Sequence, residues 1–161
     1  LNHAYAKKRV RQRLEDRPGG RYALAIMDLD NFKQANDTYG HMFGDQVLKF
    51  VADRLRHSIR GGDIAARVGG DEFLIFLEYK ADLESTIEGI YERLSGGCYH
   101  AFPISASMGV ASAEAVGTDY DTLFVKADTA AYEAKRLGKN RYVFYTPGLE
   151  LKNGYCTSSM S

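Results

Sequence analysis

The chain has 161 residues, of which 45% are apolar, so it is long enough for one domain with one sizeable core. Its 21 basic and 21 acidic residues give a formal net charge of zero, which gives no reason to expect nucleic acid or an anionic membrane as a partner. Binding of phosphates must therefore depend on a local site. Cys98 and Cys156 form no metal-binding motif or disulfide framework. No apolar run is long enough for a bilayer span and the N-terminus lacks a signal-peptide core, so we expect a cytoplasmic domain without membrane contact.

The N-terminal part predicts a helix followed by a buried strand. Apolar side chains recur every four positions from His3 to Asp16, which is typical of a helix, and the sequence RPGG at 17–20 ends it. Nearly continuous apolar residues in Tyr22–Asp30 then predict a strand that is buried on both faces. Residues 31–40, NFKQANDTYG, are mostly polar, and we expect them to form a connection.

A long helix and a hairpin are predicted next. Apolar residues four positions apart mark the helix, which RGGD at 60–63 ends: Phe43, Val47, Val51, Leu55 and Ile59. Two short β-favouring runs, Ile64–Arg67 and Phe73–Leu77, flank Gly69 and Gly70. Because glycine tolerates the positive φ of a tight turn, this pattern predicts a β-hairpin.

The C-terminal half predicts two helices and two strands. A helix covers Leu83–Leu94, alternating apolar residues at 104–110 predict a strand, and a second helix follows Asp119 and stops at Gly138. The last strand is Arg141–Tyr145, and residues 147–161 resemble a loosely attached tail. This order predicts an α/β (α+β) sandwich in which helices cover a mostly antiparallel central sheet.

Two carboxylates are predicted to meet at one edge of this sheet. Asp28 closes the buried strand and Asp71 lies at the hairpin turn, so they come together if the hairpin pairs beside that strand. Carboxylate oxygens in such a place suit Mg²⁺, which usually shares its coordination with substrate phosphates. Leu29 can add only its backbone carbonyl. The alternative is that the sequence GGDE is a solvated, inert turn.

Three blocks of sequence resemble one protein family. RVGGDEF at 67–73 is similar to the signature of the GGDEF family of diguanylate cyclases. DLDNFKQANDTYGHMFGD at 28–45 and KADTAAYEAKRLGKNR at 126–141 resemble the family's other substrate-binding segments. The resemblance covers Leu1 to about Phe144 and implies a catalytic domain at 1–146 with a nucleotidyl-cyclase or ferredoxin-like palm. LNHAY resembles the end of the family's opening motif, so we expect a regulatory or dimerising segment upstream.

The resemblance also implies roles for individual residues. Asp28, the carbonyl of Leu29 and Asp71 would hold Mg²⁺, with Mn²⁺ as an alternative. Asp71 would help to deprotonate the attacking 3′-hydroxyl, and Glu72 would lie beside it as a second catalytic residue. The implied substrate-binding residues are Phe32, Lys33, Asn36, His41, Asp45, Arg67, Gly69, Gly70, Lys135 and Lys139.

Asp45 has an independent reason to select guanine. Guanine presents two adjacent N–H donors on its Watson–Crick edge that one carboxylate accepts together, whereas adenine does not. Asn36 would contact the same base, although both residue types are also good helix caps. Lys135 and Lys139 are four residues apart, so we expect them on one side of a helix, facing the triphosphate. The alternative for each lysine is a solvated surface charge.

RGGD at 60–63 resembles the RxxD motif through which the family's product inhibits its enzymes. Arg60 would clamp a phosphate of cyclic di-GMP and Asp63 would accept hydrogen bonds from its guanine edge. Outside this context the same pair would be an ordinary surface ion pair.

The activity implied by the resemblance is condensation of two GTP molecules into cyclic di-GMP with release of two pyrophosphates. Each domain would hold one GTP, so catalysis would need a two-fold homodimer. Two alternatives belong to other classes: a catalytically silent cyclic di-GMP receptor that uses Arg60 and Asp63, and an interaction domain that senses GTP. A third alternative is an enzyme that makes a mixed cyclic dinucleotide, which Asp45 disfavours.

Overall fold

The computed structural model describes residues 2–149 of the chain. Its elements in chain order are α1 (His3–Asp16), β1 (Tyr22–Leu29), α2 (Phe32–Tyr39), α3 (His41–Ser58), β2 (Ile64–Gly69), β3 (Glu72–Glu78), α4 (Leu83–Leu94), β4 (Cys98–Tyr99), β5 (Phe102–Pro103), β6 (Ala106–Ser112), α5 (Ala113–Val116), α6 (Tyr120–Arg136) and β7 (Arg141–Phe144). Leu1 and residues 150–161, which include Cys156 and most of the tail predicted for 147–161, lie outside the described residues.

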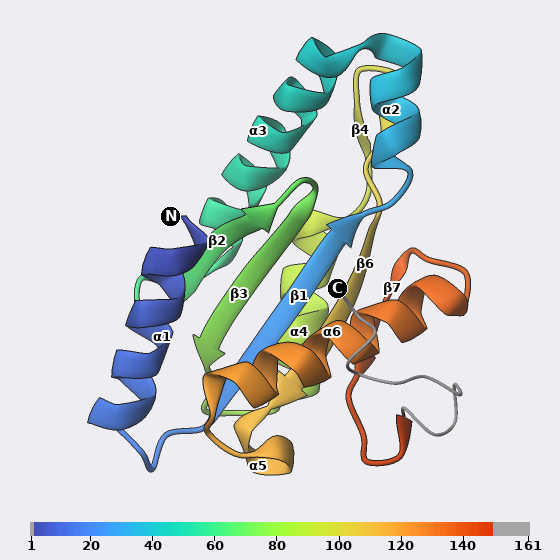
Figure 1. Ribbon diagram of the computed structural model, residues 1–161. Coiled ribbons are helices and arrows are strands. Elements are labelled where there is room, and N and C mark those ends of the chain that lie inside the picture. Colours follow the sequence, from blue (N-terminus) through green and yellow to red (C-terminus); the bar gives the residue numbers. More distant parts are fainter. Residues whose placement is uncertain (1, 150–161) are drawn as a thin grey trace.

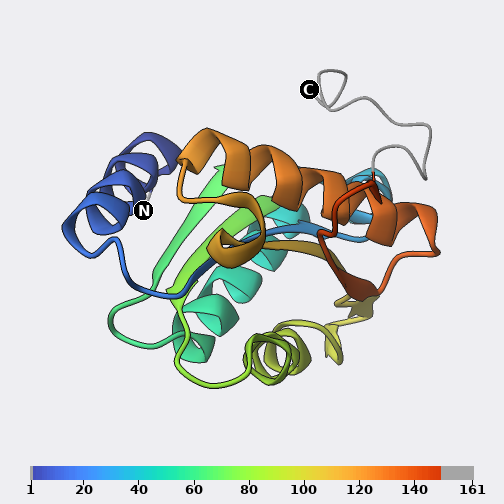
Figure 2. The ribbon, with the colours of Figure 1, turned by 90° about the horizontal axis from the view of Figure 1, so that it is seen from below.

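The larger sheet has five strands in the order β2-β3-β1-β6-β7. Neighbouring strands are antiparallel except β6 and β7, which are parallel. α1 and α6 cover one face of this sheet, and α3 and α4 cover the other (Figures 1 and 2). The predicted α/β sandwich with a mostly antiparallel sheet is therefore confirmed. None of the helices in residues 2–149 combines the length and the apolar character that a membrane span requires.

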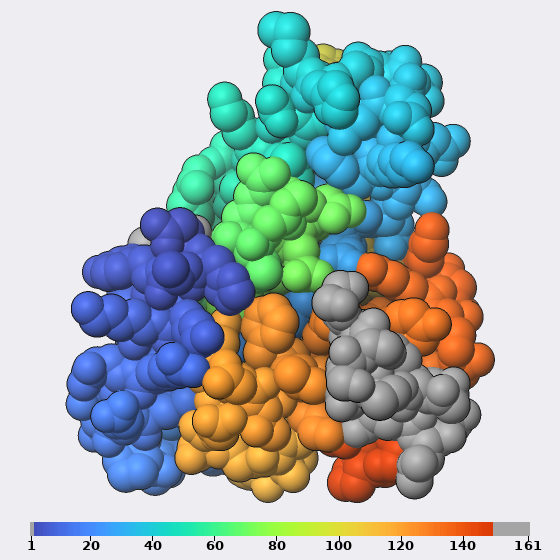
Figure 3. All heavy atoms as spheres, viewed as in Figure 1, coloured from blue at the N-terminus to red at the C-terminus, as the bar shows by residue number. Residues whose placement is uncertain are grey.

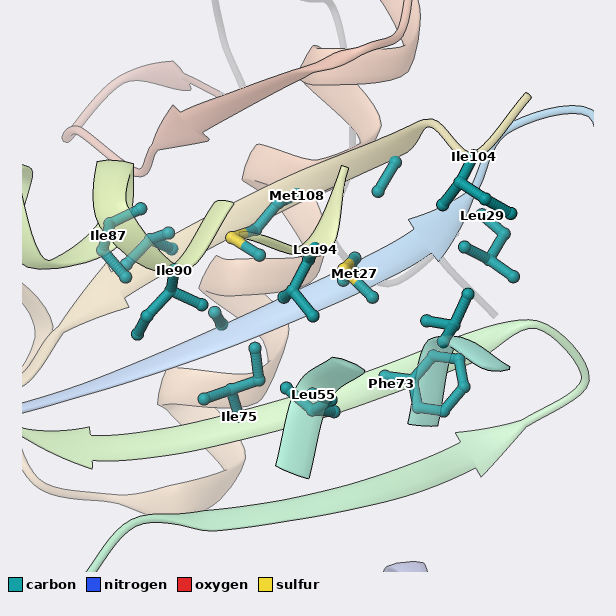
Figure 4. Packing of buried hydrophobic residues seen from close by; sticks show 14 of the residues in the cluster. Met27, Leu29, Leu55, Phe73, Ile75, Ile87, Ile90, Leu94, Ile104 and Met108 are labelled. Carbon is teal, nitrogen blue, oxygen red and sulfur yellow. The ribbon is translucent and has the colours of Figure 1, made fainter. Parts of the chain in front are cut away.

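β1 lies at the centre of the sheet, and all eight of its residues are buried, as its continuous apolar sequence predicted. Side chains alternate along a strand, so Met27 and Leu29 point into the core under α3 and α4 (Figure 4). Leu24 and Ile26 point to the opposite face, into a second core under α1 and α6. The same alternation assigns Asp28 to the α6 face of the sheet.

The predicted helices, strands and hairpin are present, with three corrections. The polar segment 31–40 is not a connection, because Phe32–Tyr39 form α2, which buries Ala35. Ile59 is the C-cap of α3 rather than part of the helix, which ends at Ser58. The paired β4 and β5 and the four-residue α5 were not predicted, since such short elements contain too few residues to establish a period.

α6, which carries Lys135, packs directly on β6. A Cβ added at Gly109 of β6 would overlap the carbonyl oxygen of Ala127 and the amide nitrogen of Ala131. The helix backbone therefore lies against the strand at this glycine, without a side chain in between. This close contact fixes the distance between the sheet and α6, the helix that carries Lys135.

Candidate active site

The register of the sheet brings the predicted acidic residues together. Asp28 on β1 pairs directly with Glu72 on β3. On both strands the residues two positions away point toward α1 and α6, so both carboxylates face α6. Asp71 precedes Glu72 in the hairpin turn, and the Leu29 amide donates to the Asp71 carbonyl oxygen at 3.2 Å. Asp28 and Asp71 thus meet at one end of the central strands.

Lys135 reaches the same place from α6 and forms an ion pair with Asp28 Oδ2. Asp28 is only 8% exposed, and its Oδ1 has no hydrogen-bond partner within the described part of the chain. Buried polar atoms are nearly always hydrogen-bonded or coordinated, so an unpartnered carboxylate oxygen beside Asp71 fits a cation site. Burial acts to lower the pKa of Lys135, but its hydrogen bond to Asp28 and the surrounding carboxylates outweigh this and raise the pKa.

Three carboxylates of the site, Asp71, Glu72 and Asp128, have raised pKa values. Burial, and then the negative charge of Asp28, raises the pKa of Glu72 to about 8. The same two causes raise the pKa of Asp71, and they raise the pKa of Asp128, on α6, to about 6. Ionising the whole cluster is therefore unfavourable, and a divalent cation would relieve this cost.

The raised pKa of Glu72 predicts that the protein without divalent cations becomes less stable as the pH rises. An unfolded glutamate ionises near pH 4.3, whereas Glu72 in the folded protein has a pKa of about 8. Between these values the folded protein retains a proton that the unfolded chain has released, so the free energy of unfolding falls with rising pH. Thermal unfolding in EDTA from pH 5.5 to pH 9 measures this slope. Glu72→Gln cannot ionise at this position and should make the slope shallower, with the raised pKa values of Asp71 and Asp128 supplying what remains; equal slopes for the two proteins would contradict the prediction.

A cavity of about 530 Å³ lies beside the acidic residues. Its lining includes all three residues predicted to hold the metal, Asp28, Leu29 and Asp71. It also includes four of the residues predicted to bind substrate: Phe32, Lys33, Lys135 and Lys139. The hairpin turn, drawn in green, reaches the surface between α1, in dark blue, and α2, in light blue (Figure 3). The three lysines that line the cavity come from α2, from α6 and from the segment after α6.

The position of Lys139 differs from the prediction. Lys139 is not on a helix with Lys135, because α6 ends at Arg136 and Gly138 turns the chain with a φ of 121°. It reaches the cavity nonetheless, and its Nζ donates to Asn31 Oδ1 at 3.2 Å. The two lysines therefore approach from separate backbone segments.

Arg67 and the two glycines shape the hairpin turn. Arg67 Nε donates to the Gly70 carbonyl oxygen at 2.8 Å, so this arginine holds the turn, and it lines a different cavity from the lysines. Gly70 has a φ of 50°, whereas Gly69 does not adopt positive φ. The predicted need for glycine is therefore confirmed at one of the two positions. Both glycines are exposed.

The predicted guanine-binding residues lie where α2 meets α3. A Cβ added at Gly44 would overlap Asn36 Oδ1, so the Asn36 amide rests against the first turns of α3, next to Asp45. Asp45 is exposed and lines a groove of about 670 Å³ with the apolar Leu48 and Phe73. His41 is the exposed first residue of α3. The lining also includes the charged Lys49, Arg56, Asp63 and Arg67, so the groove combines apolar surface with the Asp45 carboxylate, which suits a flat base, and with cationic groups.

Arg60 and Asp63 form a tight turn after α3. The Arg60 amide donates to Asp63 Oδ2 at 3.0 Å, and its guanidinium donates to the Glu78 carbonyl oxygen at 2.9 Å. Arg60 Nε lies 4.0 Å from Asp63 Oδ2. The Arg60 side chain is 63% exposed and that of Asp63 is 6% exposed. An ion pair is thus present, with its carboxylate buried and its guanidinium facing solvent.

Two acidic residues at the site were not predicted. Asp128 lines a cavity of about 360 Å³ with Asp28 and Glu72, and its spacing of seven residues from Lys135 was the signal that places both on one face of α6. Asp30 is buried just beyond β1. The sequence feature that could have pointed to Asp30 is its position two residues after Asp28, since residues two apart in an extended chain lie on the same face.

The family model described as diguanylate cyclase, GGDEF domain matches residues 1–141. The bifunctional diguanylate cyclase/cyclic di-GMP phosphodiesterase MucR of Pseudomonas aeruginosa is 42% identical over 130 residues, which cover 78% of this chain and 19% of MucR. The diguanylate cyclase DgcS of Shewanella oneidensis is 39% identical over 131 residues, covering 78% of this chain and 43% of DgcS. The chain thus spans less than half the length of these relatives.

Solved structures agree with this match. The GGDEF domain of YfiN (TpbB) from P. aeruginosa is 28% identical to this chain and superposes on it with a TM-score of 0.86. The superposition covers 96% of this chain and 95% of the YfiN domain. The GGDEF domain of DgcB from Caulobacter crescentus, solved in complex with c-di-GMP, has a TM-score of 0.79 at 28% identity, covering 90% of this chain and 88% of that one. The chain therefore belongs to the GGDEF family of diguanylate cyclase domains.

Proposed function

We propose that this domain condenses two molecules of GTP into cyclic di-GMP and releases two pyrophosphates. The observation that carries the proposal is that one cavity is lined by Asp28, Asp71 and three lysines, which places groups for a cation beside groups for a triphosphate. Membership of the family and the names of the curated relatives support the same reaction. We place the reaction in the cytoplasm, where GTP is available.

The acidic residues would hold a divalent cation. No group of three or more His, Cys, Asp and Glu side chains in residues 2–149 forms a metal site by itself, so the substrate would complete the coordination. The donors available are Asp28 with its unpartnered Oδ1, Asp71 and the carbonyl of Leu29. These hard oxygens suit Mg²⁺, or Mn²⁺ in its place. When bound, the cation neutralises charge on the triphosphate and polarises the α-phosphate.

The residues of the chain would bind the triphosphate and move one proton. Lys33, Lys135 and Lys139 neutralise the phosphate oxygens, as pyrophosphate leaves from the α-phosphorus. The 3′-oxygen of the facing nucleotide forms the new bond to that phosphorus while the bond to the bridging oxygen of the β-phosphate breaks. Asp71 accepts the 3′-hydroxyl proton, and its raised pKa suits a general base. Glu72 supplies further negative charge to the same site.

Each domain binds one GTP, and the reaction joins two. We therefore propose that two domains face each other as a homodimer during catalysis. The second bond then forms by the same steps with the two nucleotides exchanged. Arg60 would bind a phosphate of the product through its exposed guanidinium, and Asp63, whose side chain is 6% exposed and accepts from the Arg60 amide, would turn outward to accept from guanine. Product inhibition follows if that contact holds the domains apart.

Gly44→Ala tests whether Asn36 contacts guanine. The new methyl group overlaps the Asn36 side-chain amide, which can rotate away, and lies 3.2 Å from Phe32 Cζ, which must shift slightly; alanine also favours the helix over glycine. We expect thermal stability to be unchanged or higher and the affinity for a non-hydrolysable GTP analogue to fall about tenfold, as when a base loses a hydrogen bond. Calorimetric titration measures this, with Gly89→Ala on α4 as the matched control. An unchanged affinity would rule out the predicted role of Asn36.

The reaction is tested by incubating the protein with GTP and Mg²⁺ and separating the nucleotides by chromatography. The same protein fused to a dimeric coiled coil ensures that the domains meet. We expect one cyclic di-GMP and two pyrophosphates for every two GTP consumed. Binding of cyclic di-GMP without turnover would support the silent receptor, and binding of GTP alone without turnover would support the sensing domain.

A further inference from the structure

Asp30 is a buried carboxylate that has no part in the proposed chemistry. It is 5% exposed and follows β1 directly. Its Oδ1 accepts from the Ser107 hydroxyl at 2.6 Å, and its Oδ2 accepts from the Ser105 hydroxyl at 2.5 Å and from the Asn140 amide at 2.9 Å. Burying a carboxylate is unfavourable unless donors satisfy it, and each oxygen here has a donor. This separates Asp30 from Asp28, whose Oδ1 has none.

One of these donors belongs to an unusual backbone segment. The connection from α6 to β7 contains three consecutive residues with positive φ, Gly138 at 121°, Lys139 at 67° and Asn140 at 50°. For residues with a Cβ this conformation is unfavourable, and it persists only where surrounding contacts hold it. The Asn140 backbone amide donates to Asp30, while the Asn140 side-chain oxygen accepts from Tyr91 Oη at 3.2 Å.

The segment held in this way carries Lys139 to the cavity. The Lys139 amide donates to the Ala134 carbonyl oxygen at 3.0 Å, which fixes one side of the residue to α6. Asp30 fixes the other side through Asn140, the next residue along the chain. At the tip of the side chain, Nζ donates to Asn31, the neighbour of Asp30. The two residues that follow β1 thus hold the connection next to Lys139, through Asn140, and the head of the lysine itself, through Asn31.

We propose that Asp30 is a positioning residue, which clamps the α6–β7 connection so that Lys139 meets the triphosphate. The inference rests on the proposed function in one respect, that Lys139 binds phosphate. It requires no contact between Asp30 and the substrate or a metal ion, because both of its oxygens are engaged with the protein.

Asp30→Asn tests the clamp. The amide keeps the size of the side chain but removes the negative charge and one acceptor, so the bond from the Asn140 backbone amide weakens even where the side-chain oxygen still faces it. Hydrogen exchange at the Asn140 backbone amide, measured by NMR in the absence of nucleotide, should become faster in this variant. Affinity for a non-hydrolysable GTP analogue should fall about tenfold in Asp30→Asn and in Lys139→Ala. The double variant should bind no more weakly than either single variant, because both changes remove the same contact.

Binding of guanosine, which has no phosphates, serves as the readout of general damage and should not change. Asp82→Asn, at the N-cap of α4, is the matched control and should behave as the wild type. Additive losses in the double variant, or unchanged GTP-analogue affinity and amide exchange in Asp30→Asn, would overturn the clamp. Faster Asn140 exchange in a protein whose wild type binds no GTP analogue would leave the clamp of the segment standing and refute the proposed function. Should Asp30→Asn fail to fold, Ser107→Ala decides: faster Asn140 exchange with weaker GTP-analogue binding supports the clamp, and unchanged values refute it.

Discussion

Asp71→Asn should abolish formation of cyclic di-GMP while leaving the fold intact. The substitution removes the proposed base and one of the two carboxylates proposed for the cation, so we expect the rate to fall on the order of a thousandfold. The backbone is unaffected, because the Leu29 amide bonds the carbonyl oxygen of residue 71 and not its side chain. Product formed per minute, measured by chromatography in the coiled-coil fusion, gives the rate.

Asp82→Asn is the matched control for this variant and should retain the wild-type rate, since asparagine also caps helices. Stability should not fall in Asp71→Asn, because burial and the charge of Asp28 already raise the pKa of Asp71 and oppose its ionisation. A variant that folds and still forms product at a tenth of the wild-type rate or more would show that Asp71 is not the base.

Gly109→Ala should be the most destabilising of the small substitutions in the sheet. The added methyl group overlaps backbone atoms of α6, and a helix backbone cannot rotate away as a side chain can. Overpacking of this kind costs about 3 kcal/mol, which for a protein of this size lowers the melting temperature by about 6–12 °C. Thermal denaturation followed by circular dichroism measures it.

Gly89→Ala supplies a control of opposite sign. At position 89 on α4 the new Cβ would lie 3.7 Å from the Arg93 guanidinium, an ordinary contact, and alanine stabilises a helix by about 0.8–1.0 kcal/mol relative to glycine. A melting temperature for Gly109→Ala equal to that of the wild type would mean that α6 does not rest on β6 as described.

The elements that the sequence predicted well are those whose burial leaves a long periodic pattern. β1 is apolar at every position up to Met27 because both faces are covered, and α3 repeats an apolar residue every four positions because it packs on one face. α2 escaped prediction for the opposite reason. Its eight residues are largely polar, it buries only Ala35, and its N-cap Asn31 makes no capping hydrogen bond with its side chain.

The site was predictable where it depends on the ends of strands and on the hairpin. That Asp28 and Asp71 meet follows from the position of each in its own strand or turn, although the direct pairing of Asp28 with Glu72 needed the register of the sheet. Lys139 was misplaced because a spacing of four residues implies a continuous helix. What ends the helix and turns the chain is a left-handed segment held by Asp30, which lies 110 residues away from Asn140 in the sequence.

The central claim is that the carboxylates at the end of β1 and in the hairpin turn hold a divalent cation together with the triphosphate. Mn²⁺ binding followed by electron paramagnetic resonance, with a non-hydrolysable GTP analogue present, tests it most directly. We expect the wild type to bind Mn²⁺ and Asp28→Asn to bind it at least about tenfold more weakly. Equal Mn²⁺ affinity in the two proteins would contradict the claim.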